Sequence, residues 1–482
     1  MPPSWRYYRA FDLLIVGGVR FALCANAHIS ESRYRRPILW LNLDMGQPTT
    51  SALSSCMTLF SFRESSRPKV NQVFTPRRTE VNREIYVDRL DLEKALNRAL
   101  DGSLHAIIFG ESGSGKSWLY KKVLSDLGAK VATANCANAS RLGSLTEEIK
   151  HVVAGEEPRK LSEQTEEMNA AVKAVVAEGG LKSSRKYLFS EADPFLDCVR
   201  ILREDAGNSP AVLVIDNLEM IFGSTKLMNE LASLIILLDD ERYAKYRVKL
   251  LIVGVPRDAK RYLSKAHASV GNRLTEVPEV SSLSSQQVKS LVQTGFVELL
   301  RVDISPDMLS RVQDHVHEIT MGYAQPVQEY CEQLGYILED NNWKIEPEHL
   351  KLADLAWLKQ GLSQASGLVD EWMNKRETKA GRRNQVLYVL SKLKQKTFHV
   401  NDIETQLRNE FAASTKPEQN LAVDQILSEM SKGQNAILKR TMREASYEFR
   451  DAKFAMALKT SLIKDAVKEK IIKIDDPTLN FD

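Results

Sequence analysis

The chain has 482 residues and exceeds the length that one hydrophobic core usually serves, so we expect two or three domains. Its composition, 43% hydrophobic and 27% charged, is that of an ordinary globular protein, and a net charge of +3 steers the whole chain toward no class of partner. No apolar run approaches the roughly eighteen residues of a membrane helix. The five cysteines are scattered and form no CxxC pair, which argues against a disulfide framework or a zinc site and fits a reducing cytoplasm.

The N-terminal segment 1–56 superficially resembles a secretory signal, because a basic start precedes a short apolar stretch and a small-residue ANA. Arg20 interrupts that stretch, so we expect instead an upstream extension of an over-long gene model, with Met57 as the true start. A disordered tail and a signal remain the alternatives. Residues 57–85 are rich in Arg, Ser, Thr and Pro without an apolar period, which predicts an extended lead-in rather than a packed element.

The segment 86–280 alternates between helical and strand patterns. Its first predicted strand, 105–109 (HAIIF), is a short apolar run bounded by turn residues. Further strands are predicted at 130–135, 211–215, 249–255 and 273–277. Helices are predicted at 91–100, 116–127, 142–181, 195–204 and 227–238. This alternation predicts an α/β domain with a parallel sheet covered on both faces.

Beyond residue 280 the pattern becomes helical. Helices at 285–300, 306–319 and 327–338 predict a small all-α lid over 281–353, followed by a helical connector over 354–382. Within 383–473, three helices are predicted at 384–393, 401–411 and 421–431, and two strand-like stretches at 436–440 and 446–450. Three helices followed by two strands is the order of a winged-helix domain.

The clearest motif is GESGSGKS, from Gly110 to Ser117, which lies between a predicted strand and a predicted helix. Its glycines let successive backbone N–H groups point at phosphates, and the following helix adds the positive end of its dipole. We expect Lys116 to reach the β- and γ-phosphates of ATP and the Ser117 hydroxyl to ligate Mg2+. The expected nucleotide contacts along the loop are Gly110, Glu111, Ser112, Gly113, Ser114, Gly115, Lys116, Ser117 and Trp118.

The partner motif is AVLVIDNLE, in which Asp216 ends a buried strand and can hold the Mg2+ ion beside the loop. ATPases of this kind commonly place a catalytic Glu directly after that Asp, but here the position is Asn217. Glu219 is the nearest replacement as general base, with an ordinary surface glutamate as the alternative. A displaced base predicts slow hydrolysis, which suits a switch more than a motor.

At these residues the chain resembles the AAA+ ATPases of the origin-recognition and replication-initiator type and the related archaeal and STAND-like prokaryotic ATPases, over about residues 86–460. The resemblance rests on both ATP motifs, on LLIVGVPRD, on the winged-helix pattern and on a lead-in that begins Tyr86-Val87-Asp88-Arg89. It implies a P-loop NTPase sheet of the ASCE/AAA+ type, an all-α lid and a winged-helix domain. It also implies that Tyr86 and Arg89 lie beside the adenine.

Two departures from the family pattern concern the sensor residues. Polar residues are expected at the end of the fourth strand, yet Gly254, Val255 and Pro256 stand there, which leaves Arg257 or Asp258 as substitutes. In the lid, a Gly-to-Pro turn over 322–326 replaces the arginine of the replication relatives and looks more like the archaeal and STAND-like branch.

Arg273, in GNRLTEV, occupies the region where the family places an arginine finger that reaches a neighbour's γ-phosphate. An arginine that begins a strand at the surface is the alternative. Residues 382–473 hold 18 Lys and Arg against 11 Asp and Glu, which makes double-stranded DNA a candidate partner. The basic residues in question are Lys392, Lys394, Lys396, Lys439, Arg440 and Arg443. Protein docking, self-inhibition or plain solvation are the alternatives for this region.

These patterns together predict a cytoplasmic ATP- and Mg2+-binding ATPase of the AAA+/STAND-like kind that acts as a nucleotide-controlled switch on DNA or on an effector protein, with assembly into a homo-oligomer through Arg273. The alternative is a nucleotide-binding regulatory scaffold with negligible hydrolysis in a bacterial defence or mobile-element system. A small-molecule kinase is a weaker third candidate, because the sequence holds no acceptor-binding motif and the long C-terminal part would be unexplained.

Overall fold

The computed structural model describes residues 11–16, 19–24, 67–155, 193–254, 268–373, 381–441, 446–465 and 469–474. Strands β1 (Phe11–Val16) and β2 (Val19–Cys24) pair antiparallel within the unit Met1–Ser66, and this hairpin was not predicted from the sequence. Most of segment 1–56, together with Met57, lies outside the described residues. All elements discussed below belong to the second unit, Arg67–Asp482.

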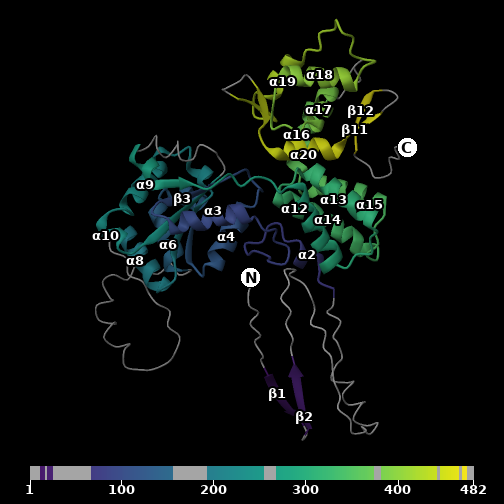
Figure 1. Cartoon of the computed structure of the whole chain (residues 1–482). Helices are drawn as coiled ribbons and strands as arrows, with labels where there is room; N and C mark the ends of the chain where they lie inside the picture. The colour runs from purple at the N-terminus through teal and green to yellow at the C-terminus, as the bar shows by residue number, and fades with distance from the viewer. Residues whose placement is uncertain are drawn as a thin grey trace, which may run out of the picture. The chain divides into compact units, whose positions relative to one another are not determined.

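A five-stranded parallel sheet forms the centre of the first half of this unit, as predicted (Figure 1). Its strands are β3 (His105–Phe109), β4 (Lys130–Asn135), β5 (Ala211–Asp216), β6 (Val248–Gly254) and β7 (Leu274–Glu276), in the order β4-β5-β6-β3-β7. Every neighbouring pair is parallel, so the carboxyl ends of all strands meet at one edge of the sheet. The last strand begins at Leu274, one residue later than predicted, because Arg273 ends a 3-10 segment, η3 (Ala268–Arg273).

Alternate residues of the strands enter two hydrophobic cores, one on each face of the sheet. On one face Ile108 and Val214 pack under α3 (Leu90–Asp101) and α4 (Lys116–Asp126). The other face, which holds Ile107, is covered by α5 (Cys136–Leu142), α6 (Leu145–Ala154), α8 (Pro194–Ala206) and α9 (Thr225–Leu237). Full burial of one such side chain stabilises the fold by about 1.5–3 kcal/mol, so unbroken apolar strands suit a sheet covered on both sides.

One predicted helix, 142–181, differs in the structure. Helix α5 ends at Leu142, and Gly143 adopts a left-handed conformation (φ 69°) that terminates it. A new helix, α6, starts after Ser144, whose hydroxyl caps the backbone N–H of Glu147. Residues 156–192 lie outside the described part of the chain.

The lid consists of helices, as predicted, and it also contains part of the lead-in. Its helices are α12 (Ser285–Val292), which continues as the π-helical turn η4 (Gln293–Leu299), α13 (Pro306–Thr320) and α14 (Ala324–Asp340). Helix α15 (Pro347–Gln360) crosses the boundary expected at residue 353 and packs on α14, and α16 (Ser363–Trp372) follows.

The prediction that 57–85 holds no packed element is wrong for its second half. Residues Val70–Val73 form a short helix, α2, and the Phe74 ring after it lies 5.0 Å from the ring of Phe296. A Cβ on Gly295 would lie 2.4 Å from the Phe74 ring, so only glycine leaves room for that ring. The lead-in therefore packs into the lid core through a few apolar residues that show no period in the sequence.

The C-terminal module spans residues 381–474, and its described residues form the predicted three helices and two strands and four further elements. The helices and strands are α17 (Arg382–Lys392), β8 (Thr397–Phe398), α18 (Val400–Glu410), α19 (Val423–Met430), β9 (Leu438–Arg440), β10 (Tyr447–Phe449), α20 (Ala452–Ser461), β11 (Leu462–Asp465) and β12 (Lys470–Lys473). The short strands form an antiparallel sheet in the order β8-β10-β9, and β11 pairs with β12. One continuous hydrophobic core joins the lid, α15, α16, α17 and α20.

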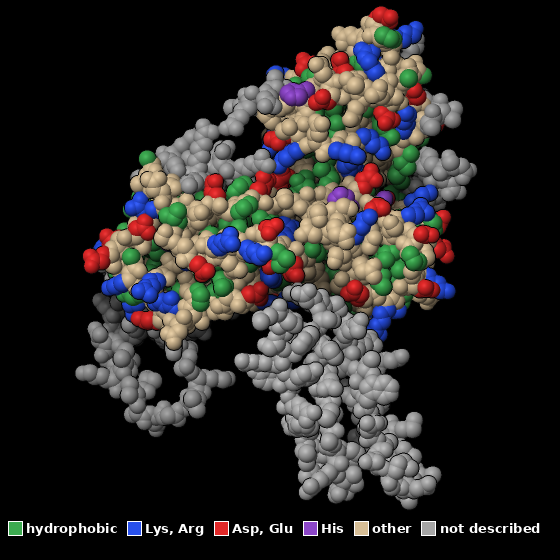
Figure 2. Space-filling model, viewed as in Figure 1, with side chains coloured by type: hydrophobic (Ala, Val, Ile, Leu, Met, Phe, Trp, Pro, Cys, Tyr) green, Lys and Arg blue, Asp and Glu red, His purple; other side chains and the backbone are tan. Residues whose placement is uncertain are grey.

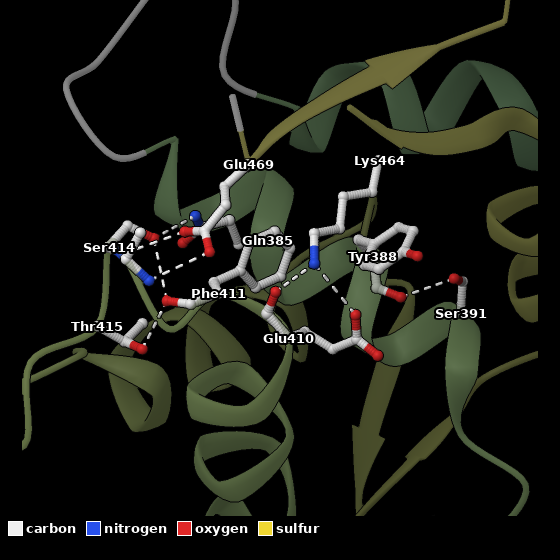
Figure 3. A network of polar contacts seen from close by, with 10 residues as sticks. Gln385, Tyr388, Ser391, Glu410, Phe411, Ser414, Thr415, Lys464 and Glu469 are labelled. Atoms are coloured by element: carbon white, nitrogen blue, oxygen red, sulfur yellow. Dashed lines mark hydrogen bonds and ion pairs between the residues drawn. The ribbon is translucent and has the colours of Figure 1, made fainter. Parts of the chain in front are cut away.

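Polar contacts fix the β11–β12 hairpin on the helices of this module (Figure 3). The carboxylate of Glu469 accepts a hydrogen bond from the backbone N–H of Ser414 at 3.1 Å, and Gln385 donates to the Ser414 hydroxyl at 2.9 Å. Lys464 donates to the backbone carbonyl and the carboxylate of Glu410. The module is thus tied together by contacts between segments far apart in the sequence.

Candidate nucleotide-binding site

The loop from Gly110 to Ser117 joins the end of β3 to the start of α4 and has the strained backbone that its glycines permit. Gly113 and Gly115 have φ values of 76° and 95°, which disfavour any residue with a side chain. A Cβ on Gly110 would lie 2.4 Å from the carbonyl oxygen of Val280. The loop can therefore curl around phosphates with its backbone N–H groups turned inward.

Lys116 lies within this loop as expected. Its ammonium group donates to the carbonyl oxygens of Gly110 at 2.8 Å and Glu111 at 2.9 Å. Burial lowers the pKa of Lys116, while the carboxylates of Glu219 and Asp216 counteract that effect. Both acidic residues that the sequence singles out therefore lie within electrostatic reach of the loop lysine.

Asp216 is held at the carboxyl edge of the sheet by two donors. Its carboxylate accepts from the Tyr120 hydroxyl at 3.1 Å and from the backbone N–H of Asn217 at 2.8 Å. Burial and the charge of Asp216 raise the pKa of Tyr120, so its hydroxyl stays protonated and can donate. Asn217 has a left-handed backbone (φ 59°), and its side-chain amide donates to Asn135, the last residue of β4, at 3.2 Å.

Glu219 lies on the 3-10 turn η2 (Leu218–Ile221) that follows β5. Its Oε2 atom is buried and has no hydrogen-bond partner among the described residues. A Cβ placed on Gly254, at the end of β6, would lie 3.7 Å from this atom. The carboxylate thus lies inside the carboxyl edge of the sheet, which makes an ordinary surface glutamate the poorer description.

A cavity of about 310 Å³ adjoins the loop and is the candidate nucleotide site. Gly113, Gly115, Lys116, Ser117 and Trp118 line it from the loop. Apolar lining comes from Ile85 and Val87 before the sheet and from Leu283 and Leu291 in the lid, which could hold a planar base. Sequence reasoning did not find the lid residues, because nothing in their pattern separates a cavity wall from an ordinary core position.

Tyr86 and Arg89 both line this cavity, but their polar groups are engaged by protein, and their place beside the adenine stays a prediction. The Tyr86 hydroxyl donates to Glu93 at 3.0 Å. The guanidinium group of Arg89 donates to the carbonyl oxygens of Ser114 at 2.8 Å and Ser281 at 2.9 Å. Arg89 therefore joins the phosphate loop to the segment that leads into the lid.

The lead-in forms another wall that the sequence did not predict. Pro76, Arg77, Arg78 and Thr79 line the cavity, and Lys121 on α4 donates to the carbonyl oxygen of Thr79 at 2.7 Å. Such backbone contacts leave no signal in the sequence.

Glu111 connects the loop to two distant parts of the chain. Its carboxylate accepts a hydrogen bond from the Tyr323 hydroxyl of the lid at 2.8 Å and forms an ion pair with Lys396 of the C-terminal module. Burial tends to raise the pKa of Glu111, but the hydrogen bonds from Lys396 and Tyr323 outweigh it, so the pKa is lowered. The backbone N–H of Gln325 also donates to the carbonyl oxygen of Gly113 at 3.0 Å. The loop is thus in direct contact with both lid and module.

Arg273 does not belong to the site of its own chain. Leu274 pairs with His105 at the amino end of β3, whereas the phosphate loop follows the carboxyl end of that strand. Arg273 forms an ion pair with Asp239 at 2.7 Å and donates to the carbonyl oxygen of Ser269 at 2.8 Å. Its action on a neighbouring chain remains a prediction. The sensor substitutes Arg257 and Asp258 lie outside the described residues, as does Arg443.

The residues expected to hold Mg2+, Ser117 and Asp216, are compatible with that ion. This ion usually takes one or two carboxylates and completes its shell with phosphate oxygens and water, so a large cluster of protein ligands is not required. Within the described ranges no group of three or more His, Cys, Asp or Glu side chains converges. Ser117 is exposed and lines the cavity, whereas Asp216 and the unpartnered Glu219 oxygen lie at the carboxyl edge of the sheet, outside the cavity lining. These residues fit a metal bound chiefly by nucleotide and water.

No helix in the part of the chain that the structure describes has the length and apolarity needed to cross a bilayer.

Comparison with known proteins gives one family match and several similar folds. Residues 99–263 match the family model described as AAA domain. A Walker-type ATPase of Pyrococcus abyssi is similar with a TM-score of 0.45 at 16% identity, over 79% of this chain and 98% of that one. The Aeropyrum pernix ORC1 protein in complex with DNA gives 0.39 at 16% identity, over 81% and 96%. Cdc6p from Pyrobaculum aerophilum gives 0.41 at 16% identity, over 81% and 97%.

Structural similarity at this level says nothing about activity or partners, and a search of the curated proteins finds none that matches the chain. The family match, the parallel sheet and the glycine loop before α4 agree with one another. Residues 99–263 of this chain therefore match the AAA domain family and have a P-loop NTPase fold.

Proposed function

We propose that the chain is an Mg-ATP-dependent switch that hydrolyses ATP slowly and passes its nucleotide state to the C-terminal module. The observation that carries this proposal is the position of Glu111, a residue of the phosphate loop that is bonded to Tyr323 in the lid and paired with Lys396 in the module. A change in the loop on nucleotide binding or release acts directly on both contacts.

In the nucleotide-bound state, the loop N–H groups and Lys116 hold the phosphates, and Ser117 and Asp216 hold Mg2+. The ion, when bound, neutralises the charge of the phosphate oxygens. Glu219 accepts the proton of the attacking water, and its buried, unpartnered Oε2 supports this role. Because it sits on η2 instead of directly after Asp216, we expect turnover to be slow.

Phosphate release by the full chain with Mg-ATP tests the catalytic part. Glu219→Gln should lower the rate by about 100-fold or more, within the usual contribution of a general base, and should leave ATP affinity nearly unchanged. Glu241→Gln, which alters an exposed glutamate on α10 (Glu241–Ala244), is the matched control. Equal rates for both variants would reject Glu219 as the base.

The second candidate function is a nucleotide-binding scaffold without turnover. Asn217 favours it, because the residue directly after Asp216 has no carboxylate and donates its amide to Asn135. If the wild-type chain releases no phosphate with Mg-ATP, with or without DNA, the scaffold is the better description. An effector protein would then supply any further activity.

We further propose that the C-terminal module is a winged helix whose contact with the ATPase core competes with DNA. The order of its helices and short strands supports this fold. Lys392, Lys394 and Lys396 line a cavity of about 870 Å³ together with core and lid residues such as Glu279 and Tyr323. On the face seen in Figure 2, basic and acidic side chains are interspersed without a large area of one sign.

Lys396 cannot pair with Glu111 and with a DNA phosphate at once, so we expect DNA to bind when the module leaves the core. Filter binding of double-stranded DNA to the full chain, across a salt series and with ATP, ADP or no nucleotide, measures this. Affinity that falls with salt and differs between nucleotide states supports the proposal. No salt-dependent affinity in any state would reject DNA and leave a protein partner.

A further inference from the structure

A second cavity, of about 500 Å³, lies between the lead-in, α14 and α15. It shares Pro76, Arg77 and Arg78 with the nucleotide cavity, but its other lining differs and includes Thr75, Glu329 and Trp357. None of the residues proposed above for phosphate, Mg2+ or DNA lines it. Its volume suits a compact ligand.

Three residues that line this cavity each have a buried polar atom without a hydrogen-bond partner among the described residues. The atoms are Oγ1 of Thr75, Oε2 of Glu329 and Nε1 of Trp357, and these residues are 2%, 6% and 0% exposed. A Cβ on Gly361, which also lines the cavity, would lie 2.5 Å from Trp357 Nε1 and 3.2 Å from Glu329 Oε2. The indole N–H donor and the carboxylate acceptor therefore both lie close to the Gly361 backbone, where a side chain would clash with Trp357.

Buried polar groups are nearly always hydrogen-bonded, and an unpartnered group costs about 1–3 kcal/mol, more when it is charged. Three such atoms around one cavity therefore indicate a site built for a polar ligand. The indole N–H of Trp357 can only donate a hydrogen bond, and an ionised Glu329 carboxylate can only accept one.

The charges of the cavity define the ligand further. Oε1 of Glu329 accepts from Gln325 at 2.8 Å and from Arg77 at 3.3 Å, whereas Oε2 is left for another donor. Burial raises the pKa of Glu332, the hydrogen bond from Tyr336 opposes this, and the nearby charge of Glu329 adds to the rise. Two carboxylates thus face one cavity, with arginines at its rim.

We propose that this cavity binds a small zwitterion of the α-amino-acid class, with its ammonium group on Glu329 Oε2 and its carboxylate on the Trp357 indole N–H and the guanidinium groups of Arg77 and Arg78. The Thr75 hydroxyl can donate to the carboxylate or accept from the ammonium group. Such a ligand supplies an acceptor for the Trp357 N–H and a donor for Glu329 Oε2, and each of these bonds is charge-assisted.

The site is connected to the phosphate loop through one residue. Gln325 donates its side-chain amide to Glu329, and its backbone N–H donates to the carbonyl oxygen of Gly113. A ligand that pulls on Glu329 therefore acts on Gln325 and on the loop. By thermodynamic linkage, ligand and nucleotide must change each other's affinity by the same factor.

Isothermal titration calorimetry of the nucleotide-free full chain against each free proteinogenic amino acid tests the proposal independently of ATP turnover. We expect at least one to bind, and its N-acetyl and its carboxamide derivatives to bind at least about tenfold more weakly, because each removes one charged contact. If no amino acid binds, or if both blocked derivatives bind as well as the parent, the assignment is wrong.

Variants then locate the site. Trp357→Phe, which keeps an aromatic ring but removes the N–H, and Glu329→Gln should each weaken binding about tenfold or more, and Thr75→Val by a smaller factor. Trp372→Phe, the same substitution on α16 outside this cavity, is the control and should leave affinity unchanged. Circular dichroism and melting curves verify folding, and Thr75→Val provides the decisive variant if a larger change unfolds the chain. Wild-type affinity in all three cavity variants would overturn the proposal.

Discussion

The contact between Glu111 and Lys396 predicts that breaking it speeds nucleotide release. The Lys396 side chain is 51% exposed and that of Glu111 30%, so solvent screens their ion pair, which we expect to contribute about 0.5–1 kcal/mol. Lys396→Met removes this pair alone. Glu111→Gln also weakens the hydrogen bond from Tyr323, because a neutral acceptor is poorer than a carboxylate, at a cost of about 1 kcal/mol more.

These energies correspond to faster release of a fluorescent ADP analogue. We expect an increase of about two- to fivefold for Lys396→Met and of about 10- to 30-fold for Glu111→Gln. Stopped-flow measurement on the full chain at low and high salt gives the rates, and salt should reduce the effect of Lys396→Met. Lys394→Met is the matched control, since that lysine lines the same cavity and has no ion pair with Glu111 among the described residues.

The variant that carries both Glu111→Gln and Lys396→Met tests whether the two side chains interact. If Glu111 and Lys396 interact as described, adding Lys396→Met to Glu111→Gln changes the rate little, and the double-mutant cycle gives a coupling energy of about 0.5–1 kcal/mol. Effects that simply add would refute the reasoning, because the two side chains would then act independently.

Three other predictions follow from single residues. Gly115→Ala adds a Cβ to a residue with φ 95°, at 3.3 Å from Ala324, so the ATP affinity measured in a titration should fall at least about tenfold. Gly128→Ala is the control, because Gly128 also has a positive φ but open space around it, and ATP affinity should stay unchanged. Burial lowers the pKa of His105 to about 4, below its value in the unfolded chain, so the folded protein loses stability as the pH falls below about 6.5. The free energy of urea unfolding should therefore be about 2 kcal/mol lower at pH 5 than at pH 7. If His105→Gln shows the same difference between pH 5 and pH 7 as the wild type, this assignment is wrong. Arg273→Ala should leave ATP binding intact but lower ATP turnover by about 100-fold or more at protein concentrations where chains associate. An arginine finger is excluded if turnover depends neither on protein concentration nor on this substitution.

The sequence by itself determined the parallel sheet and the glycine-rich loop that precedes α4. The strands of the sheet appear as unbroken apolar runs because both of their faces are buried, and this pattern survives without knowledge of their neighbours. The spacing of Gly110, Gly113 and Gly115 before Lys116 is equally local, because a backbone that curls around phosphates needs glycine at fixed places. Asp216 is likewise recognised locally, as an acidic residue at the end of an apolar strand.

Only the tertiary structure decided which distant segments meet at that loop. Tyr323 and Glu111 are 212 residues apart, and neither the lid helix nor the loop carries a pattern that pairs them. The packing of Phe74 depends on the space left by Gly295, and the burial of Glu219 depends on how η2 turns after β5. Periodicity records which face of an element is buried, whereas the partner of a side chain depends on how elements pack in space.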